Sequence, residues 1–330
     1  MTTSILVTGC GGFIGKFLLK DLLLDPENMV YGVDSQVKLS ALVKSEYIPK
    51  EVCDRFVPLN LDLSKQSDCL DLPDVDFVFH LAAVNGTSLF YEIPWEVFYH
   101  STLTTINTLH RYNLSSRLKR FIYTSSSEVY ASVVDQSPER CPTDERVPVG
   151  FYDVTNPRWS YGGAKLAGEI ATFAAGHQHD TPFSIIRYHN VYGPDMGLDH
   201  VIPDFINRGK SGLFELYGTE NQRSFIYISD AIEATLAVAK SEEGLNRVVH
   251  VGSMDMVTME LLAKKIMVIA EWQGEISHFS APTGSTLNRC PDTTFLNSVI
   301  GFSPRVSLDE GITRVVRSHN LPKNRIVDKI

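Results

Sequence analysis

The stretch SILVTGCGGFIG, residues 4–15, decides the fold of this chain. It opens with a short apolar run that predicts a buried strand, and it closes with the apolar residues that begin a helix. Gly9, Gly12 and Gly15 lie between the two, where glycine permits a tight turn, close approach of the backbone to a ligand, and close packing of the helix on a sheet. The pattern therefore predicts a strand–turn–helix unit whose turn faces a ligand.

The rest of the first half repeats this order of short apolar strands and longer helices. We expect strands at about residues 4–7, 29–33, 55–59, 77–81, 121–123 and 183–188, and helices at about 14–24, 94–113 and 160–177. Short apolar runs that do not alternate with polar residues indicate parallel strands covered by helices on both faces. The sequence therefore predicts an α/β fold with a doubly wound parallel sheet of the Rossmann type.

The pattern of residues changes after about residue 190, where Gly and Pro become frequent. We expect strands at about residues 213–217 and 224–228, and helices at about 229–240, 259–272 and 308–318. A late strand near 248–252 is expected to return to the main sheet. The prediction is a cofactor-binding domain over 1–188 and a smaller, interleaved C-terminal α/β domain over 189–330 that binds the substrate.

Composition excludes several classes of function. The chain has 330 residues and a formal net charge of −9, which argues against a nucleic-acid partner. No apolar run is long enough to span a membrane and no basic leader is present, so a cytoplasmic protein is expected. The five cysteines lack metal-ligand spacing and the ten histidines form no metal pattern, so no metal is expected.

An acidic residue, Asp34, ends the second expected strand, about 20 residues beyond the glycines. A carboxylate at this place accepts hydrogen bonds from the adenosine ribose and repels a 2′-phosphate, so NAD is expected rather than NADP. The alternatives are a tight turn with nothing bound and, for Asp34, a simple strand cap. The expected NAD contacts in the turn are Gly9, Gly12, Phe13, Ile14 and Gly15.

The segment SYGGAKLAGE places Tyr161 and Lys165 four residues apart, on one face of a helix. An ammonium group beside a phenol stabilises the phenolate and lowers its pKa from about 10. Such a tyrosine can act as a general base near neutral pH. The alternative is an ordinary solvated helix face.

A hydroxyl-rich segment, TSSSEVY at 124–130, follows the fifth expected strand. Together with the glycine turn, HLAA at 80–83, YGGAK, RYHNVYGP and RSFIYISD, it resembles the extended short-chain dehydrogenase/reductases over about residues 4–312. The order of these motifs is most similar to the members that modify nucleoside-diphosphate sugars.

This resemblance implies that NAD serves as a recycled oxidant at the sugar C4. Tyr161 would take the proton of the 4-hydroxyl, Ser126 would hydrogen-bond that oxygen, and Lys165 would also hold the nicotinamide ribose. Further implied cofactor contacts are Asp62, Leu63, Leu81, Ala82 and Ala83. Ser127 and Glu128 would face the sugar, while Asn190, Arg223 and Arg289 would bind the substrate. A homodimer built on the helix of Tyr161 is also implied.

The reaction that follows oxidation is less closely defined. SSEVY resembles the decarboxylases and dehydratases of the group more than the simple 4-epimerases, and NRCPD at 288–292 resembles the Arg-x-Pro-Asp of the decarboxylases. Arg289 suits a carboxylate, although diphosphate binding is the alternative. We expect decarboxylation of a UDP-uronate. C4 epimerisation, 4,6-dehydration and an NAD-sensing regulator without turnover remain alternatives. The stretch 135–157 is longer and more polar than the family pattern.

Overall fold

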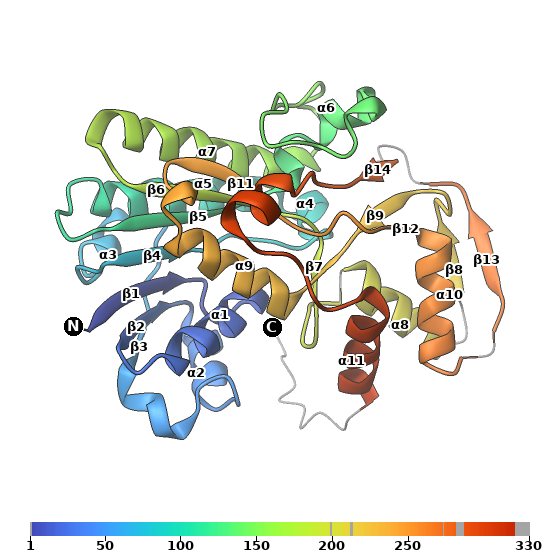
Figure 1. Cartoon of the computed structure of the whole chain (residues 1–330), viewed down its shortest axis with the longest axis horizontal. Coiled ribbons are helices and arrows are strands. Elements are labelled where there is room, and N and C mark those ends of the chain that lie inside the picture. Colours follow the sequence, from blue (N-terminus) through green and yellow to red (C-terminus); the bar gives the residue numbers. More distant parts are fainter. Residues whose placement is uncertain (1, 199, 212–213, 273, 282–286, 321–330) are drawn as a thin grey trace.

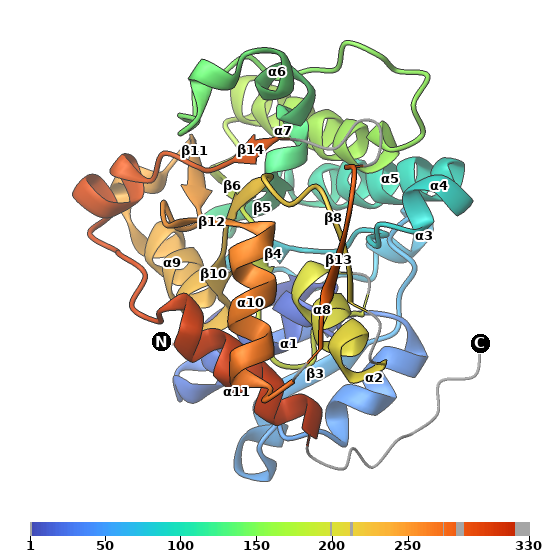
Figure 2. The same cartoon turned by 90° about the vertical axis from the view of Figure 1, so that its right-hand side faces the viewer.

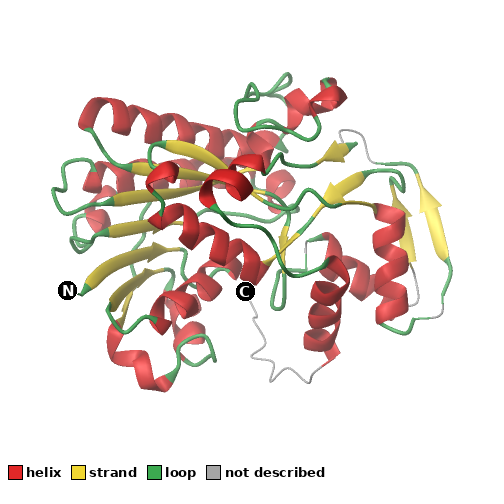
Figure 3. Cartoon of the chain, viewed as in Figure 1, coloured by secondary structure: helices red, strands yellow, loops and turns green. Residues whose placement is uncertain are grey.

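The computed structural model describes residues 2–320 except 199, 212–213, 273 and 282–286. Within this part of the chain, seven parallel strands form the central sheet in the order β11-β6-β5-β4-β1-β2-β3 (labelled in Figure 1; strands yellow in Figure 3). These strands are β1 (Thr3–Thr8), β2 (Asn28–Val33), β3 (Phe56–Leu59), β4 (Phe77–His80), β5 (Arg120–Ser126), β6 (Phe183–Tyr188) and β11 (Arg247–Val251). The doubly wound Rossmann-type sheet is confirmed, and β11 is the late strand that was expected.

Helices cover both faces of this sheet (Figure 1). Alternate residues of β1 point to opposite faces, so Ile5 and Val7 join one apolar core and Leu6 joins the other. Helices α5 and α7 pack against each other over the Leu6 core, while α1 packs against α9 on the opposite face. The helices of this part are α1 (Phe13–Leu24), α2 (Gln36–Val43), α3 (Gln66–Cys69), α4 (Leu89–Glu92), α5 (Pro94–Tyr112), α6 (Ala131–Gln136), α7 (Trp159–His179) and α9 (Ile228–Lys240).

The remaining elements gather beyond one end of the sheet (Figures 1 and 2). They comprise α8 (Val201–Ser211), α10 (Met259–Ile269), α11 (Leu308–Asn320) and three small sheets. The small sheets pair β7 (Val191–Tyr192) with β10 (Ile226–Tyr227), β8 (Phe214–Tyr217) with β13 (Ile276–Phe279), and β9 (Gln222–Ser224) with both β12 (Met256–Thr258) and β14 (Asn288–Arg289). The division into two domains at residue 188 stays a prediction.

One expected strand is wrong in detail. The run 224–228 is not a single strand, because β9 and β10 belong to different small sheets and Ile228 already begins α9. Leu213, the first residue of another expected strand, lies outside the described residues. In the described part of the chain, no helix is both long and apolar enough to cross a membrane.

The sheet also determines where a ligand can bind. Because all its strands run in parallel, their carboxyl ends meet at one edge, and the loops that follow them converge there. The glycine turn follows β1, Glu128 follows β5, and Asn190 follows β6.

Candidate active site

A cavity of about 1290 Å³ lies at this edge of the sheet. It brings together most of the residues that the sequence predicted. Those that line it are Gly9, Gly12, Phe13, Ile14, Gly15, Leu81, Ala83, Ser126, Ser127, Glu128, Tyr161, Lys165, Asn190, Arg223 and Arg289. Asp34, Asp62, Leu63 and Ala82 are not among its lining residues. The individual roles assigned to these residues stay predictions.

The glycine turn has the shape that a dinucleotide requires. Gly9 has φ +69°, and a Cβ added there would lie 2.9 Å from the Ala82 backbone nitrogen. A Cβ at Gly15 would lie 2.2 Å from the Gly9 carbonyl oxygen, so neither position tolerates a side chain. Gly12 precedes the first residue of α1 without a side-chain cap, which leaves backbone N–H groups of the helix end directed at the cavity. These residues fit the pyrophosphate of NAD.

Asp34 lies behind the turn, at the end of β2. Its Oδ2 atom accepts a hydrogen bond of 2.9 Å from the Gly11 backbone N–H, and Lys38 Nζ lies 3.9 Å from its Oδ1 atom. The Asp34 carboxylate thus lies beside the turn at the place where a ribose hydroxyl is bound in such folds. This arrangement fits NAD and opposes a 2′-phosphate.

Asp62 has a different environment from the one expected. Its carboxylate accepts hydrogen bonds from the Ser64 backbone and hydroxyl and lies 3.3 Å from Lys65 Nζ. The Ser64 hydroxyl lowers the pKa of this carboxyl below its ordinary value. Asp62 therefore closes a local turn in this structure, and its contact with an adenine ring stays a prediction.

Tyr161 and Lys165 project from α7 toward the end of β5. The Tyr161 ring stacks on Phe90 at 5.1 Å between centroids, and its hydroxyl is hydrogen-bonded to Ser126. Lys165 Nζ lies 5.7 Å from the centre of the Tyr161 ring and donates to the Thr124 carbonyl oxygen at 2.7 Å. The three groups predicted to act at the sugar C4, including Ser126, are thus assembled.

The expected lowering of the Tyr161 pKa is wrong for this structure. Burial raises the pKa of the Tyr161 phenol, the negative charge of Glu128 raises it further, and the hydrogen bond with Ser126 opposes both. Burial also lowers the pKa of Lys165 to about 7, against the opposite effect of Glu169. Desolvation therefore sets the direction of both pKa shifts.

Glu128 and Arg289, predicted from distant motifs, form an ion pair. Arg289 Nη1 donates to Glu128 Oε1 at 2.6 Å, and Arg158 Nη2 lies 3.6 Å from the same oxygen. Burial raises the pKa of the Glu128 carboxyl, but the charges of Arg289 and Arg158 together bring it below its ordinary value. Glu128 is therefore ionised in a buried site.

A third guanidinium increases the positive charge in this part of the cavity. Arg223 on β9 lies directly opposite Arg289 on β14 in the strand pairing. Burial, followed by the charge of Arg289, lowers the pKa of Arg223 to about 9. Asn190 follows the end of β6, and its side-chain amide donates to the carbonyl oxygen of Ser224, the last residue of β9, at 2.8 Å. The site thus presents three cations around one carboxylate, which favours an anionic ligand.

Arg158 is the site residue that the sequence reasoning missed. It lines the cavity, and its guanidinium also lies over the Trp159 ring at 5.4 Å. In the described part of the chain its buried Nε atom has no hydrogen-bond partner. Its position three residues before Tyr161, where a helix brings two side chains to the same face, was the available signal.

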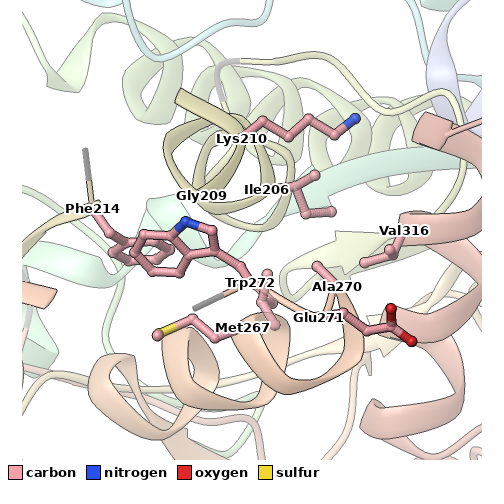
Figure 4. Close-up of a pocket in the computed structure, with 10 residues that line it drawn as sticks. Ile206, Gly209, Lys210, Phe214, Met267, Ala270, Glu271, Trp272 and Val316 are labelled. Carbon is pink, nitrogen blue, oxygen red and sulfur yellow. The ribbon is translucent and has the colours of Figure 1, made fainter. Parts of the chain in front are cut away.

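A second, smaller cavity of about 270 Å³ lies between α8, β8, α10 and α11 (Figure 4). Its wall is mainly apolar, with Trp272 stacked on Phe214 at 5.3 Å. Lys210 reaches past its edge to donate to the His319 carbonyl oxygen at 3.1 Å. None of the residues predicted to carry chemistry lines this cavity.

A known family accounts for this geometry. The model of the NAD dependent epimerase/dehydratase family matches residues 5–252. The chain belongs to this family. The expected resemblance to the enzymes that modify nucleotide sugars is therefore confirmed, and the chain is an NAD-dependent enzyme of this group.

Relatives with different reactions share this sequence pattern. The chain is 32% identical to UDP-N-acetyl-alpha-D-glucosaminuronate decarboxylase of Bacillus cytotoxicus, over 96% of this chain and 98% of that protein. It is 28% identical to GDP-mannose 3,5-epimerase 1 of Oryza sativa, over 93% of this chain and 79% of that protein. The UDP-glucuronic acid 4-epimerase of Bacillus cereus, solved with a fluorinated UDP-glucuronic acid and NAD, has the same fold, with a TM-score of 0.83, 23% identity and coverage of 96% and 98% of the two chains. The group is thus established, and it spans decarboxylases, epimerases and dehydratases.

Proposed function

We propose that this enzyme decarboxylates a UDP-uronate through a transient 4-keto sugar. The observation that carries the proposal is the ion pair of Glu128 with Arg289, with Arg158 beside it, in the same cavity as Ser126 and Tyr161. Arginine binds a carboxylate through two parallel hydrogen bonds and keeps its charge when buried. A uronate has such a carboxylate as its C6 group, bonded directly to the ring carbon C5.

The chemistry of the site follows from where the charges lie. When NAD is bound, it accepts hydride from the sugar C4 and can return it. Tyr161 and Ser126 would hold the C4 oxygen. Burial keeps Tyr161 protonated in this structure, so it must release its own proton before it takes that of the C4 hydroxyl, and Lys165, whose pKa is lowered to about 7, is the neighbouring base. A 4-keto uronate is a β-keto acid, so loss of carbon dioxide leaves an enolate whose charge rests on the same oxygen. Hydrogen bonds from Ser126 and Tyr161 stabilise that oxygen in the transition state.

In this proposal, Glu128 positions the guanidinium of Arg289. Glu128 accepts from the Arg289 Nη1 atom and so fixes the orientation of the guanidinium that would meet the substrate carboxylate. Glu128 also offsets part of the positive charge of Arg289 and Arg158. The substrate carboxylate is therefore bound less tightly than by the two arginines alone, and the product can leave. The name of the Bacillus cytotoxicus relative, a decarboxylase of a UDP-aminosugar uronate, agrees with this choice of reaction.

The proposed enzyme works as a homodimer built on α5 and α7. These two helices pack against each other, and each exposes apolar side chains on its outer surface. On α5, Trp95 is 67% exposed, and Phe98 and Ile106 are also exposed; on α7, Ile170 is 61% exposed and Phe173 is exposed as well. A second copy of the same pair would bury this surface in a four-helix contact.

The proposal is tested by the mass of the sugar nucleotide after incubation with the enzyme and NAD. UDP-glucuronate and UDP-N-acetylglucosaminuronate are compared with UDP-N-acetylglucosamine, which has no carboxylate. Loss of one carbon dioxide from a uronate supports the proposal. An unchanged mass with a new chromatographic peak would make the protein an epimerase, and loss of water would make it a dehydratase.

Two variants separate catalysis at this site from a contaminating activity. Tyr161→Phe removes the hydroxyl that meets Ser126 and should lower turnover by about 10²–10⁴-fold, the usual effect of a lost general base. Tyr152→Phe, at a tyrosine that is 61% exposed, is the matched control and should keep full turnover. Equal activity of both variants would place the observed turnover outside this cavity.

A further inference from the structure

Two cysteines that the reaction does not use lie next to the substrate-binding arginines. Cys141 belongs to the long polar stretch 135–157 and is partly exposed, whereas Cys290 directly follows Arg289 and is 1% exposed. Both are free thiols, each shifts the pKa of the other, and Cys290 Sγ donates to the Met254 carbonyl oxygen at 3.5 Å.

The backbone holds these two segments together. The Thr143 N–H donates to the Cys290 carbonyl oxygen at 2.9 Å, and the Asp292 N–H donates to the Thr143 carbonyl oxygen at 2.7 Å. Thr143 and Pro291 thereby form a bridge between parallel segments. The backbone pairing therefore places the segment of Cys141 directly beside Cys290.

We propose that Cys141 and Cys290 form a redox-reactive pair that a low-molecular-weight disulfide converts to an intramolecular disulfide bond. In the first step the Cys141 thiolate attacks one sulfur of the small disulfide, forms a mixed disulfide and releases one small thiolate. In the second step the Cys290 sulfur, after loss of its proton, attacks the Cys141 sulfur and releases the second small thiolate. The protein loses two electrons and two protons, and the small disulfide gains them as two thiols.

The electrostatic surroundings assign different roles to the two sulfurs. The neighbouring Cys290 thiol lowers the pKa of the Cys141 thiol to about 7, burial opposes this, and the charge of Arg223 supports it. The Cys141 thiol and burial raise the pKa of the Cys290 thiol. The partly exposed sulfur is thus the nucleophile, and the buried one is the resolving thiol. Burial raises the pKa of the thiols of Cys10 and Cys69, which makes them unreactive.

Oxidation would also affect the active site, and this consequence rests on the proposed function. A disulfide bond holds the two sulfurs at covalent distance, and Arg289, the last residue of β14, directly precedes Cys290. Its guanidinium pairs with Glu128 at 2.6 Å, a contact that a small backbone displacement breaks. Misplacement of a positioning group by about 1 Å lowers turnover by roughly 100-fold, so oxidation should reduce turnover by at least roughly tenfold.

The test is peptide mapping of the complete protein after treatment with oxidised glutathione. A linked pair of peptides containing Cys141 and Cys290, lost on addition of dithiothreitol, is expected in the wild-type protein and in the control Cys53→Ser, whose cysteine is exposed. Cys141→Ser should show no link and no glutathione on Cys290. Stable glutathione on Cys141 without a link, or modification confined to Cys53, would overturn the proposal.

Turnover measured on the same samples separates the two claims. Linked protein that loses turnover and regains it with dithiothreitol supports both the thiol pair and its effect on Arg289. Linked protein with unchanged turnover would overturn the effect on the active site. If reduced protein turns over no UDP-uronate, the proposed function fails, while the peptide map still decides whether the thiol pair exists.

Discussion

Arg289 and Glu128 are 161 positions apart in the sequence, yet Arg289 Nη1 lies 2.6 Å from Glu128 Oε1. Glu128 follows the central strand β5, whereas Arg289 lies on β14 of a small outer sheet. This ion pair therefore joins the sheet that fits NAD to the elements that carry the predicted substrate contacts. Both side chains are largely buried, so each charge offsets the desolvation cost of the other.

The first prediction concerns the pH dependence of stability in Arg289→Met. Arg289 holds the pKa of Glu128 below its ordinary value of 4.5, so its stabilising effect is present above that pH and is lost as pH falls through the folded-state pKa. Removing one partner of a buried pair costs about 3–5 kcal/mol. The free energy of unfolding should therefore fall clearly at pH 7, and the difference from wild type should be smaller at pH 4, which lies below the ordinary pKa of this carboxyl.

The control for this prediction is Arg314→Met, which breaks an exposed pair with Glu310 on α11. It should change the free energy of unfolding by less than about 1 kcal/mol at either pH. A loss of stability in Arg289→Met that is equal at pH 7 and pH 4 would show that the charge of Glu128 is not the cause.

The second prediction concerns Arg158, whose guanidinium lies 3.6 Å from Glu128 Oε1. In the inactive Tyr161→Phe background, adding Arg158→Met should weaken binding of a UDP-uronate by roughly tenfold or more, since a hydrogen bond to a charged group contributes about 1.5–3 kcal/mol. Binding of UDP-glucose, which lacks the carboxylate, should change little. Calorimetric titration measures both, and Arg146→Met, at a side chain that is 93% exposed, is the control. Equal weakening of both ligands would assign Arg158 to the diphosphate or to folding.

The third prediction concerns the choice of cofactor. The Asp34 carboxylate accepts from the Gly11 N–H at 2.9 Å and opposes a 2′-phosphate, whereas Lys38 Nζ lies 3.9 Å from it. Asp34→Asn removes the negative charge and leaves the lysine, so the affinity ratio of NAD to NADP should fall by roughly tenfold or more. Titration of the two dinucleotides measures the ratio, with Asp71→Asn at an exposed position as the control. An unchanged ratio would contradict the placement of the ribose beside Asp34.

The fourth prediction concerns the proposed homodimer. Ile170 on α7 is 61% exposed, and a glutamate at this position would place two charges in the contact between copies. Ile170→Glu should convert the dimer to a monomer in sedimentation equilibrium. Val268→Glu on α10, where the side chain is 78% exposed, should leave the dimer intact. A monomeric wild-type protein, or dissociation by both variants alike, would contradict this interface.

Local sequence patterns predicted the sheet and the cofactor turn well. The strand expected at 183–188 is β6 as observed, and the turn glycines occupy positions that admit no Cβ. Such features follow from a few neighbouring residues, because strand burial and turn geometry are local constraints. The grouping of Ser126, Tyr161 and Lys165 was also predicted, since parallel strands and a helix face bring their ends to one edge.

Other features depend on contacts between distant segments. The run 224–228 reads as one apolar strand, but its two halves pair with partners in different small sheets. The pKa of Tyr161 is set by burial, which spacing from Lys165 does not reveal. Cys141 and Cys290 come close together because the segment that follows β14 pairs with the 135–157 stretch, and no local motif marks that approach.

The most direct test of the account is the mass of the sugar nucleotide formed from a UDP-uronate and NAD in deuterium oxide. Decarboxylation through a 4-keto sugar predicts a product that has lost one carbon dioxide and carries one solvent deuterium on carbon, with no product from Tyr161→Phe. A product of unchanged mass would contradict the central claim. It would mean that Arg289 and Arg158 bind the carboxylate without promoting its loss.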